Sequence, residues 1–336
     1  MLGNTYPQAS SLPYQERTPM SRSTCIVFAV LMWAAATAAS AAALARNARS
    51  LRVKPTRSVV YKTVRNVRLQ LRVFEPEGHK ASEKRPAIVF FFGGGWVGGT
   101  PGQFYPQCAY LASRGMVAIS AEYRVKSRHK VSPFECVTDG KSAVRWVRAN
   151  AATLGVDPER VAAGGGSAGG HVGACTGTIE GLEEPGEDAA VSSKPNAMVL
   201  FNPVLALDFE EWKKAGLPEA RVAQLRQRFG GRDPREISPV HHVKAGIPPT
   251  IVFHGKADKT VPYATAERFA TSMKAAGCRC ELVGYDGLGH GFFNFGRGDG
   301  KPFPDTMRRA DAFLASLGWL TGEPTIDAFL DKQDKE

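Results

Sequence analysis

Continuous apolar runs alternate with amphipathic stretches along the chain from residue 55 onward. The runs lie at residues 86–96, 116–123, 160–167, 197–203 and 249–255. Strands that helices cover on both faces show such runs. Apolar positions recur at helical spacing over residues 136–152, 263–276 and 305–317. The pattern predicts a doubly wound α/β fold with a mostly parallel sheet of about eight strands and helices on both faces.

Four segments depart from this alternation. Residues 59–64 and 67–76 alternate with period two, which predicts an antiparallel hairpin at a sheet edge. Residues 156–160 indicate a turn that leads into the next strand. Residues 205–247 interrupt the rhythm with a helical pattern, and we expect a small insertion there, either a lid or pocket wall or a lengthened crossover. The catalytic domain is expected over residues 46–325, followed by a polar C-terminal tail at 326–336.

The N-terminal segment differs in composition from the rest of the chain. Residues 25–45 carry no charge, follow a short basic region and end in small residues. Residues 1–45 therefore indicate either a secretory signal peptide or an uncleaved membrane anchor. The first alternative predicts export to the periplasm or outside the cell, and the second predicts a membrane-anchored catalytic domain outside the cytoplasm.

The net charge of +11 does not by itself indicate a nucleic-acid partner. Lysine and arginine are spread along the 336-residue chain, and no basic run interleaved with aromatic residues stands out. The charge favours a basic exported enzyme over a nucleic-acid-binding protein. The oligomeric state is not indicated.

The cysteines allow a disulfide but indicate no metal site. Cys25 lies in the N-terminal segment, and the five other cysteines cannot all pair with one another. A Cys108–Cys136 bond is one open alternative. Cys278 and Cys280 lack a second ligand pair at zinc spacing, so we expect no metal and no cofactor.

The candidate nucleophile is Ser167. It lies in a G-x-S-x-G motif, Gly165 to Gly169, between a predicted strand and a helical stretch. A serine on such a sharp turn projects its hydroxyl, and the flanking glycines leave no Cβ to obstruct the close approach of the chain. The start of the following helix adds partial positive charge where an oxyanion would develop.

A serine nucleophile needs a base and a carboxylate that orients it. Asp258 follows the strand at 249–255, and His290 follows the strand that ends at Tyr285. Both lie in loops at the carboxyl ends of strands, on the same edge as Ser167, in the chain order Ser, Asp, His. Asp286 is a rival carboxylate, although it lies only four residues before His290.

An early glycine loop supplies candidate oxyanion donors. Phe92-Gly93-Gly94-Gly95-Trp96 ends the first long apolar run, and backbone N–H groups in a dry pocket stabilise an oxyanion well. We expect the N–H groups of Gly94, Gly95 and Ala168 to form the oxyanion hole. Trp96 is a candidate substrate-binding residue.

Together these motifs resemble the α/β-hydrolase fold, and more narrowly its esterase/lipase family with an HGGG-type oxyanion loop. The resemblance rests on GGGSAGG, HGKADKTVP, GLGHGF and FGGGW and covers roughly residues 58–320. Within this family the chain resembles bacterial acetyl and carboxyl esterases and exported polysaccharide esterases. Phe92 stands where that branch usually has histidine, so we expect packing rather than hydrogen bonding to hold the loop.

The expected function is that of a serine carboxylesterase that hydrolyses short-chain esters, such as acetyl esters, through Ser167, Asp258 and His290. A small-molecule ester or an acetylated polysaccharide is the expected substrate class. Two alternatives stay open. A prolyl-oligopeptidase-like peptidase uses the same chain order but normally carries a large additional domain, and a binding protein with a hydrolase fold would need no catalysis.

Overall fold

The predicted strands belong to one sheet. The computed structural model describes residues 51–214 and 216–335, and these form an eight-stranded sheet in the order β1-β2-β4-β3-β5-β6-β7-β8. The strands are β1 (Arg57–Val64), β2 (Val67–Phe74), β3 (Arg85–Phe91), β4 (Val117–Ala121), β5 (Val156–Gly166), β6 (Ala197–Phe201), β7 (Thr250–Gly255) and β8 (Cys280–Tyr285). Strands β1 and β2 form the predicted antiparallel hairpin at one edge, and β4, β3, β5, β6, β7 and β8 run parallel. The predicted α/β fold is confirmed.

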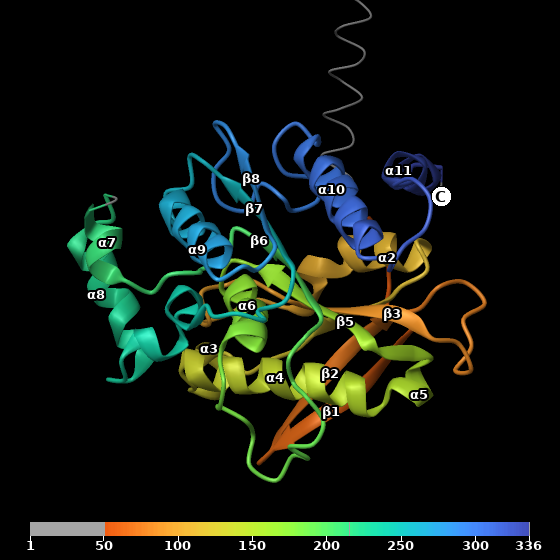
Figure 1. Cartoon of the computed structure of the whole chain (residues 1–336), viewed down its shortest axis with the longest axis horizontal. Helices are drawn as coiled ribbons and strands as arrows, with labels where there is room; N and C mark the ends of the chain where they lie inside the picture. Colours follow the sequence, from red (N-terminus) through yellow and green to blue (C-terminus); the bar gives the residue numbers. More distant parts are fainter. Residues whose placement is uncertain (1–50, 215, 336) are drawn as a thin grey trace, which may run out of the picture. The chain divides into compact units, whose positions relative to one another are not determined.

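Helices connect the strands and cover both faces of the sheet (Figure 1). The α-helices are α2 (Tyr105–Ser113), α3 (Lys126–His129), α4 (Pro133–Ala149), α5 (Ala151–Leu154), α6 (Ala168–Thr178), α7 (Phe209–Lys214), α8 (Glu219–Arg226), α9 (Tyr263–Ala275), α10 (Pro302–Ser316) and α11 (Ile326–Gln333). Short 3-10 helices are η1 (Pro101–Phe104), η2 (Gln227–Phe229), η3 (Pro234–Ile237) and η4 (Pro239–His242). Helix α2 was not among the predicted helices, although Pro106 near its start is a common helix-start residue.

The core lies on both sides of the sheet because successive residues of a strand point to opposite faces. In β3, Val89 and Phe91 pack in the cluster that includes residues of α4 and α6. Ile88 and Phe90 pack in the cluster that includes residues of α2 and α10. In Figure 1, α4 lies below the central strands and α2 and α10 lie above them. This double cover explains why β3 is an unbroken apolar run in the sequence.

Two local predictions were wrong. Residues 156–160, predicted as a turn, are the irregular start of β5, where the pairing with β3 jumps from Val156 to Val161. Residues 326–336, predicted as a polar tail, contain helix α11, whose Ile326 is fully buried in the cluster of α2 and α10. A short amphipathic helix at a chain end gives a weak sequence signal because only one or two positions need to be apolar.

The cysteines of the described residues are free. Cys108 and Cys136 lie in core clusters on opposite faces of the sheet, so the disulfide considered between them does not form. Within the part of the chain that the structure describes, no group of three or more His, Cys, Asp or Glu side chains is placed to hold a metal ion.

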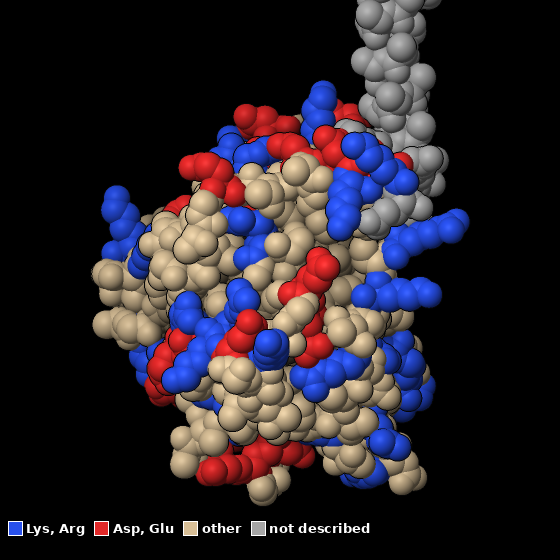
Figure 2. Space-filling view, turned by 90° about the vertical axis from the view of Figure 1, so that its right-hand side faces the viewer, with Lys and Arg blue, Asp and Glu red and all other residues tan. Residues whose placement is uncertain are grey.

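The expected signal peptide or anchor, residues 1–45, lies outside the described residues. No helix within residues 51–214 and 216–335 is long and apolar enough to cross a bilayer. On the face that Figure 2 shows, Lys and Arg side chains are interspersed with Asp and Glu side chains rather than gathered into a continuous basic surface.

Candidate active site

Ser167 lies on a strained turn between β5 and α6. Its backbone has φ 55° and ψ −121°, a conformation that L-residues rarely adopt. A Cβ on Gly165 would lie 2.5 Å from the Phe91 carbonyl oxygen, and one on Gly169 would lie 2.1 Å from the same atom. Only glycine fits at these two positions, which explains why both flank the serine.

The structure brings the three predicted catalytic side chains into one hydrogen-bonded chain. Ser167 Oγ lies 2.9 Å from His290 Nε2, and His290 Nδ1 lies 2.7 Å from Asp258 Oδ2. With the imidazole proton on Nδ1, the serine hydroxyl donates to Nε2 and Nδ1–H donates to the carboxylate. The rival Asp286 instead pairs with Lys256 and is 88% exposed.

Asp258 is held as an ionised acceptor. Its side chain is fully buried, and Oδ1 accepts the backbone N–H groups of Thr260 and Val261 at 2.8 and 2.9 Å. Burial opposes ionisation, but hydrogen bonds from His254 and His290 outweigh it, and they hold the pKa of Asp258 well below its usual range. A carboxylate that stays ionised keeps the His290 proton on Nδ1, which leaves Nε2 free to accept a proton.

Asn202 is a site residue that sequence reasoning missed. It follows β6 with φ 42° and donates from Nδ2 to Asp258 Oδ2 at 2.6 Å. The only local signal is its position at the end of a parallel strand, where ligand-binding groups gather. Its contact therefore adds a donor to the oxygen that His290 also uses.

The glycine loop after β3 lines a cavity beside Ser167. The cavity has a volume of about 340 Å³. Its walls include Gly94, Gly95 and Ala168, the three predicted oxyanion donors. Within the described residues, the N–H groups of Gly94 and Gly95 have no hydrogen-bond partner, and that of Ala168 opens helix α6 and has no partner inside the helix. All three amides are thus available to an oxygen in the cavity.

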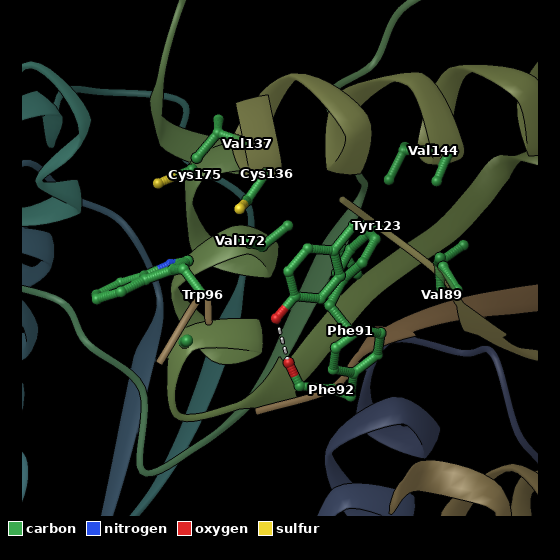
Figure 3. Close-up of a cluster of buried hydrophobic side chains, with 14 of the residues drawn as sticks. Val89, Phe91, Phe92, Trp96, Tyr123, Cys136, Val137, Val144, Val172 and Cys175 are labelled. Carbon is green, nitrogen blue, oxygen red and sulfur yellow. Dashed lines mark hydrogen bonds between the residues drawn. The ribbon is translucent and has the colours of Figure 1, made fainter. Parts of the chain in front are cut away.

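Packing of Phe92 holds this loop, as expected, but hydrogen bonds hold it as well, which the expectation did not include. The Phe92 side chain is fully buried and stacks on Tyr123 with ring centroids 4.3 Å apart. The Tyr123 hydroxyl donates to the Phe92 carbonyl oxygen at 2.6 Å (Figure 3). A Cβ on Gly99 would lie 2.5 Å from the Phe92 ring, so the ring also fits closely against the end of the loop.

The side chain of Gln103 also holds the glycine loop, through hydrogen bonds. The sequence analysis did not identify this residue. Its Oε1 accepts the Gly93 N–H at 2.6 Å, and its Nε2 donates to Asn294 Oδ1 at 2.9 Å. Asn294 in turn donates to the Gly291 carbonyl oxygen at 2.8 Å, next to His290. One side chain therefore joins the glycine loop to the loop that carries His290.

Trp96 lines the cavity but is only 3% exposed. It therefore closes one side of the cavity and offers a substrate little contact surface. Its indole N–H donates to His171 Nδ1 at 3.2 Å, and His171 Nε2 lies 2.6 Å from the Ile237 carbonyl oxygen in η3. Burial lowers the pKa of His171 to about 4, so this histidine is neutral at pH 7. A neutral His171 thus connects the glycine loop to the segment between β6 and β7.

The segment between β6 and β7, residues 202–249, contains α7, α8 and three of the short 3-10 helices. In Figure 1, α7 and α8 lie at the left end of the molecule. Trp212, Arg221, Leu225 and Arg228 of this segment line the cavity. The predicted insertion therefore forms a pocket wall. The histidines of η4, His241 and His242, do not line it.

The sequence matches the family model described as BD-FAE over residues 71–273, more than half of the chain. The chain belongs to the BD-FAE family. The match includes Ser167 and Asp258 and ends before His290.

Named relatives of this BD-FAE protein are esterases. Esterase LipC of Mycobacterium tuberculosis is 33% identical over 221 residues, which are 62% of this chain and 53% of that protein. An isoprenylcysteine alpha-carbonyl methylesterase of Arabidopsis thaliana is 26% identical over 248 residues, 70% of this chain and 56% of that protein. The chain spans about half the length of these curated relatives.

Solved structures of a bacterial esterase match over nearly their whole length. The apo form of Thermogutta terrifontis esterase 2 is 52% identical, with a TM-score of 0.74, and the match covers 82% of this chain and 98% of that one. Other structures of the same esterase are described as propionate-bound, butyrate-bound and phosphonylated by sarin. The chain thus has the α/β-hydrolase fold of this esterase family.

Proposed function

We propose that the protein is a carboxylesterase whose nucleophile is Ser167. The observation that carries the proposal is the hydrogen-bonded chain from Ser167 through His290 to the buried Asp258, beside a cavity with free backbone donors. Esterase relatives of similar fold support the activity.

The proposed reaction begins when His290 Nε2 takes the Ser167 proton and Oγ attacks the ester carbonyl carbon. The N–H groups of Gly94, Gly95 and Ala168 then stabilise the oxyanion. His290 returns the proton to the departing alcohol, and an acyl-enzyme remains. Water, activated by His290, releases the acid and restores the serine. Asp258 holds the imidazole in the required tautomer and stabilises its charged form.

We further propose that the acyl group is short, such as acetyl. The cavity of about 340 Å³, bordered by Trp96, Trp212 and Phe293, is at the small end of the range of ligand pockets. Propionate and butyrate in structures of the Thermogutta esterase support the same size class. An acetylated polysaccharide outside the cytoplasm is the proposed natural substrate, on the ground of the N-terminal segment and the basic charge.

The test compares the rates of hydrolysis of p-nitrophenyl acetate, butyrate and octanoate by the wild-type protein and its Ser167→Ala variant. We expect turnover of the two short esters and a loss on the order of 10³-fold or more in the variant. A folded wild-type protein without activity would refute the carboxylesterase proposal and favour the binding-protein alternative. A clear preference for octanoate would refute the short-acyl proposal alone.

Export is tested separately. The proposal expects mature protein outside the cytoplasm with an N-terminus that begins after the apolar segment, as mass spectrometry would detect. Retention in the membrane with residues 1–45 intact would favour the anchor instead.

A further inference from the structure

Two arginines line the candidate catalytic cavity without an acidic partner. Arg221 lies on α8 and Arg228 in η2. Arg228 Nη1 donates to the Gly95 carbonyl oxygen at 2.8 Å. Within residues 51–214 and 216–335, neither guanidinium forms an ion pair with a carboxylate, and Arg221 Nη1 donates to the neutral Gln224 Oε1 on the same helix. Two positive charges therefore border the space where the substrate would bind.

Other mostly buried arginines have a counter-charge or several oxygen acceptors. Arg114, Arg124 and Arg145 each hydrogen-bond a carboxylate. Burial lowers the pKa of each guanidinium, but the carboxylates outweigh it and raise the pKa above its usual value. Arg148 has no such carboxylate, but three oxygen acceptors engage its guanidinium. In these four cases, carboxylates or other oxygen acceptors therefore satisfy the N–H donors of the buried guanidinium.

Arg228 departs from this pattern. Burial and the neighbouring charge of Arg221 lower the pKa of Arg228. The Gly95 carbonyl is the acceptor that the structure gives it, whereas a guanidinium has five N–H donors. Placing two like charges together at a cavity wall is unfavourable unless an anion from outside joins them.

We propose that the cavity selects esters that carry a carboxylate, and that Arg221 and Arg228 bind this carboxylate. The proposal rests on the carboxylesterase function and names its substrate class. A guanidinium fork matches the two oxygens of a carboxylate. Trp212 and Leu225 line the same cavity and provide apolar contact for the carbon chain between the ester and the acid.

The position of Arg228 limits the length of that chain. A Cβ on Gly93 would lie 3.3 Å from Ser167 Cβ, and Arg228 contacts the carbonyl of Gly95, two residues further on. Two residues of chain span at most about 7 Å, so the guanidinium lies within roughly 15 Å of the serine. A carboxylate a few bonds from the scissile carbonyl, as in a glutarate monoester, falls within this limit.

The experiment compares matched anionic and neutral esters. In the acyl arm, mono-p-nitrophenyl glutarate is compared with p-nitrophenyl valerate, which has a methyl group in place of the carboxylate. In the alcohol arm, 3-acetoxybenzoate is compared with 3-methylphenyl acetate. The proposal expects a higher kcat/KM for the anionic ester in at least one arm, through a lower KM. Added salt should reduce this preference, because it screens exposed charges.

The variant Arg221→Met tests the assignment, because Arg221 makes no hydrogen bond to the glycine loop. We expect the ratio of anionic to neutral kcat/KM to fall about tenfold, the effect of one charge-assisted hydrogen bond. Arg226→Met is the matched control. Arg226 lies on the same helix, pairs with Glu210 and does not line the cavity, so its loss should leave the ratio unchanged.

The outcomes separate this proposal from the function on which it rests. Hydrolysis of neutral esters without preference for the anionic ester in either arm overturns the carboxylate proposal and retains the carboxylesterase. An equal fall of the ratio in Arg221→Met and Arg226→Met also overturns it, because the effect is then general electrostatics. No hydrolysis of any of the four esters by folded protein overturns the carboxylesterase and the carboxylate proposal with it.

Discussion

Substitution by leucine should have opposite effects on stability at two glutamines that lie four residues apart. Gln103 holds the Gly93 N–H and Asn294. Gln107, in α2, is fully buried, and within the described residues neither its Oε1 nor its Nε2 has a hydrogen-bond partner. The substitutions Gln103→Leu and Gln107→Leu remove the same amide and add a similar apolar side chain.

The expected effects on stability follow from the hydrogen bonds. Gln103→Leu leaves the Gly93 N–H and Asn294 Oδ1 without their partners, at a cost of about 2 kcal/mol in the free energy of unfolding. Gln107→Leu removes a buried amide that nothing satisfies, so it should stabilise the protein by about 1 to 2 kcal/mol. The melting temperature should move by about 2–4 °C per kcal/mol, downward for Gln103→Leu and upward for Gln107→Leu.

The expected effects on catalysis differ as well. Gln103 joins the glycine loop to the loop of His290, so its loss should misplace the oxyanion donors relative to the base. A displacement near 1 Å costs up to about 100-fold in rate, and we expect kcat for p-nitrophenyl acetate to fall about 10- to 100-fold. Gln107→Leu should leave kcat unchanged. Gln103→Glu retains an acceptor for the Gly93 N–H and should restore part of the rate.

Denaturant unfolding and steady-state kinetics on the three variants check this reasoning. It is refuted if Gln103→Leu keeps the wild-type kcat, because the loop is then held by Phe92 and Tyr123 alone. The claim that the Gln107 amide destabilises the fold is refuted if Gln107→Leu lowers the free energy of unfolding by more than about 1 kcal/mol. Removal of an unsatisfied buried amide cannot produce that result.

Three further predictions concern the candidate triad and its supports. Asp258→Asn should lower kcat about 10⁴-fold with the fold intact, because the imidazole loses its tautomer; steady-state kinetics and circular dichroism check this. Gly169→Ala should lower the free energy of unfolding by about 3 kcal/mol, as its methyl group would lie 2.1 Å from the Phe91 carbonyl oxygen; denaturant unfolding measures the loss. The pKa of His171 falls from 6.5 to about 4 on folding, so the unfolded chain binds the proton first as the pH falls. Stability should therefore drop by about 3 kcal/mol between pH 6.5 and 4, and unfolding of His171→Gln should show a smaller drop.

The fold and the positions of Ser167, Asp258 and His290 could be predicted because their signals are local. Ser167 and Asp258 follow the buried apolar runs of β5 and β7, and His290 follows the half-buried edge strand β8. Parallel strands bring their carboxyl ends to one edge. The glycines near Ser167 could be predicted for the same reason, because a sharp turn packed against β3 leaves no room for a Cβ. These features need only the neighbouring sequence and the topology of the sheet.

Gln103, Asn202 and Asn294 could not be found in this way. Their partners are a backbone amide, a carboxylate and an amide side chain from distant parts of the chain, and only tertiary packing brings them together. Amide side chains are common in loops and carry no motif of their own. The irregular start of β5 was missed for a related reason, because its pairing with β3 depends on a jump in register that the sequence does not mark.

The sheet and the β6–β7 segment contribute different properties to the site. The sheet edge positions Ser167, Asp258 and His290, whereas α8 and η2 provide Arg221, Leu225 and Arg228 on the wall. The two parts are nevertheless coupled, because Arg228 holds the Gly95 carbonyl and His171 connects Trp96 to η3. A substitution in this segment that changes the substrate preference should therefore also affect the proposed oxyanion donors. It follows that substitutions at Arg228 should alter kcat for all esters, while those at Arg221, which has no contact with the loop, should act on the choice between esters.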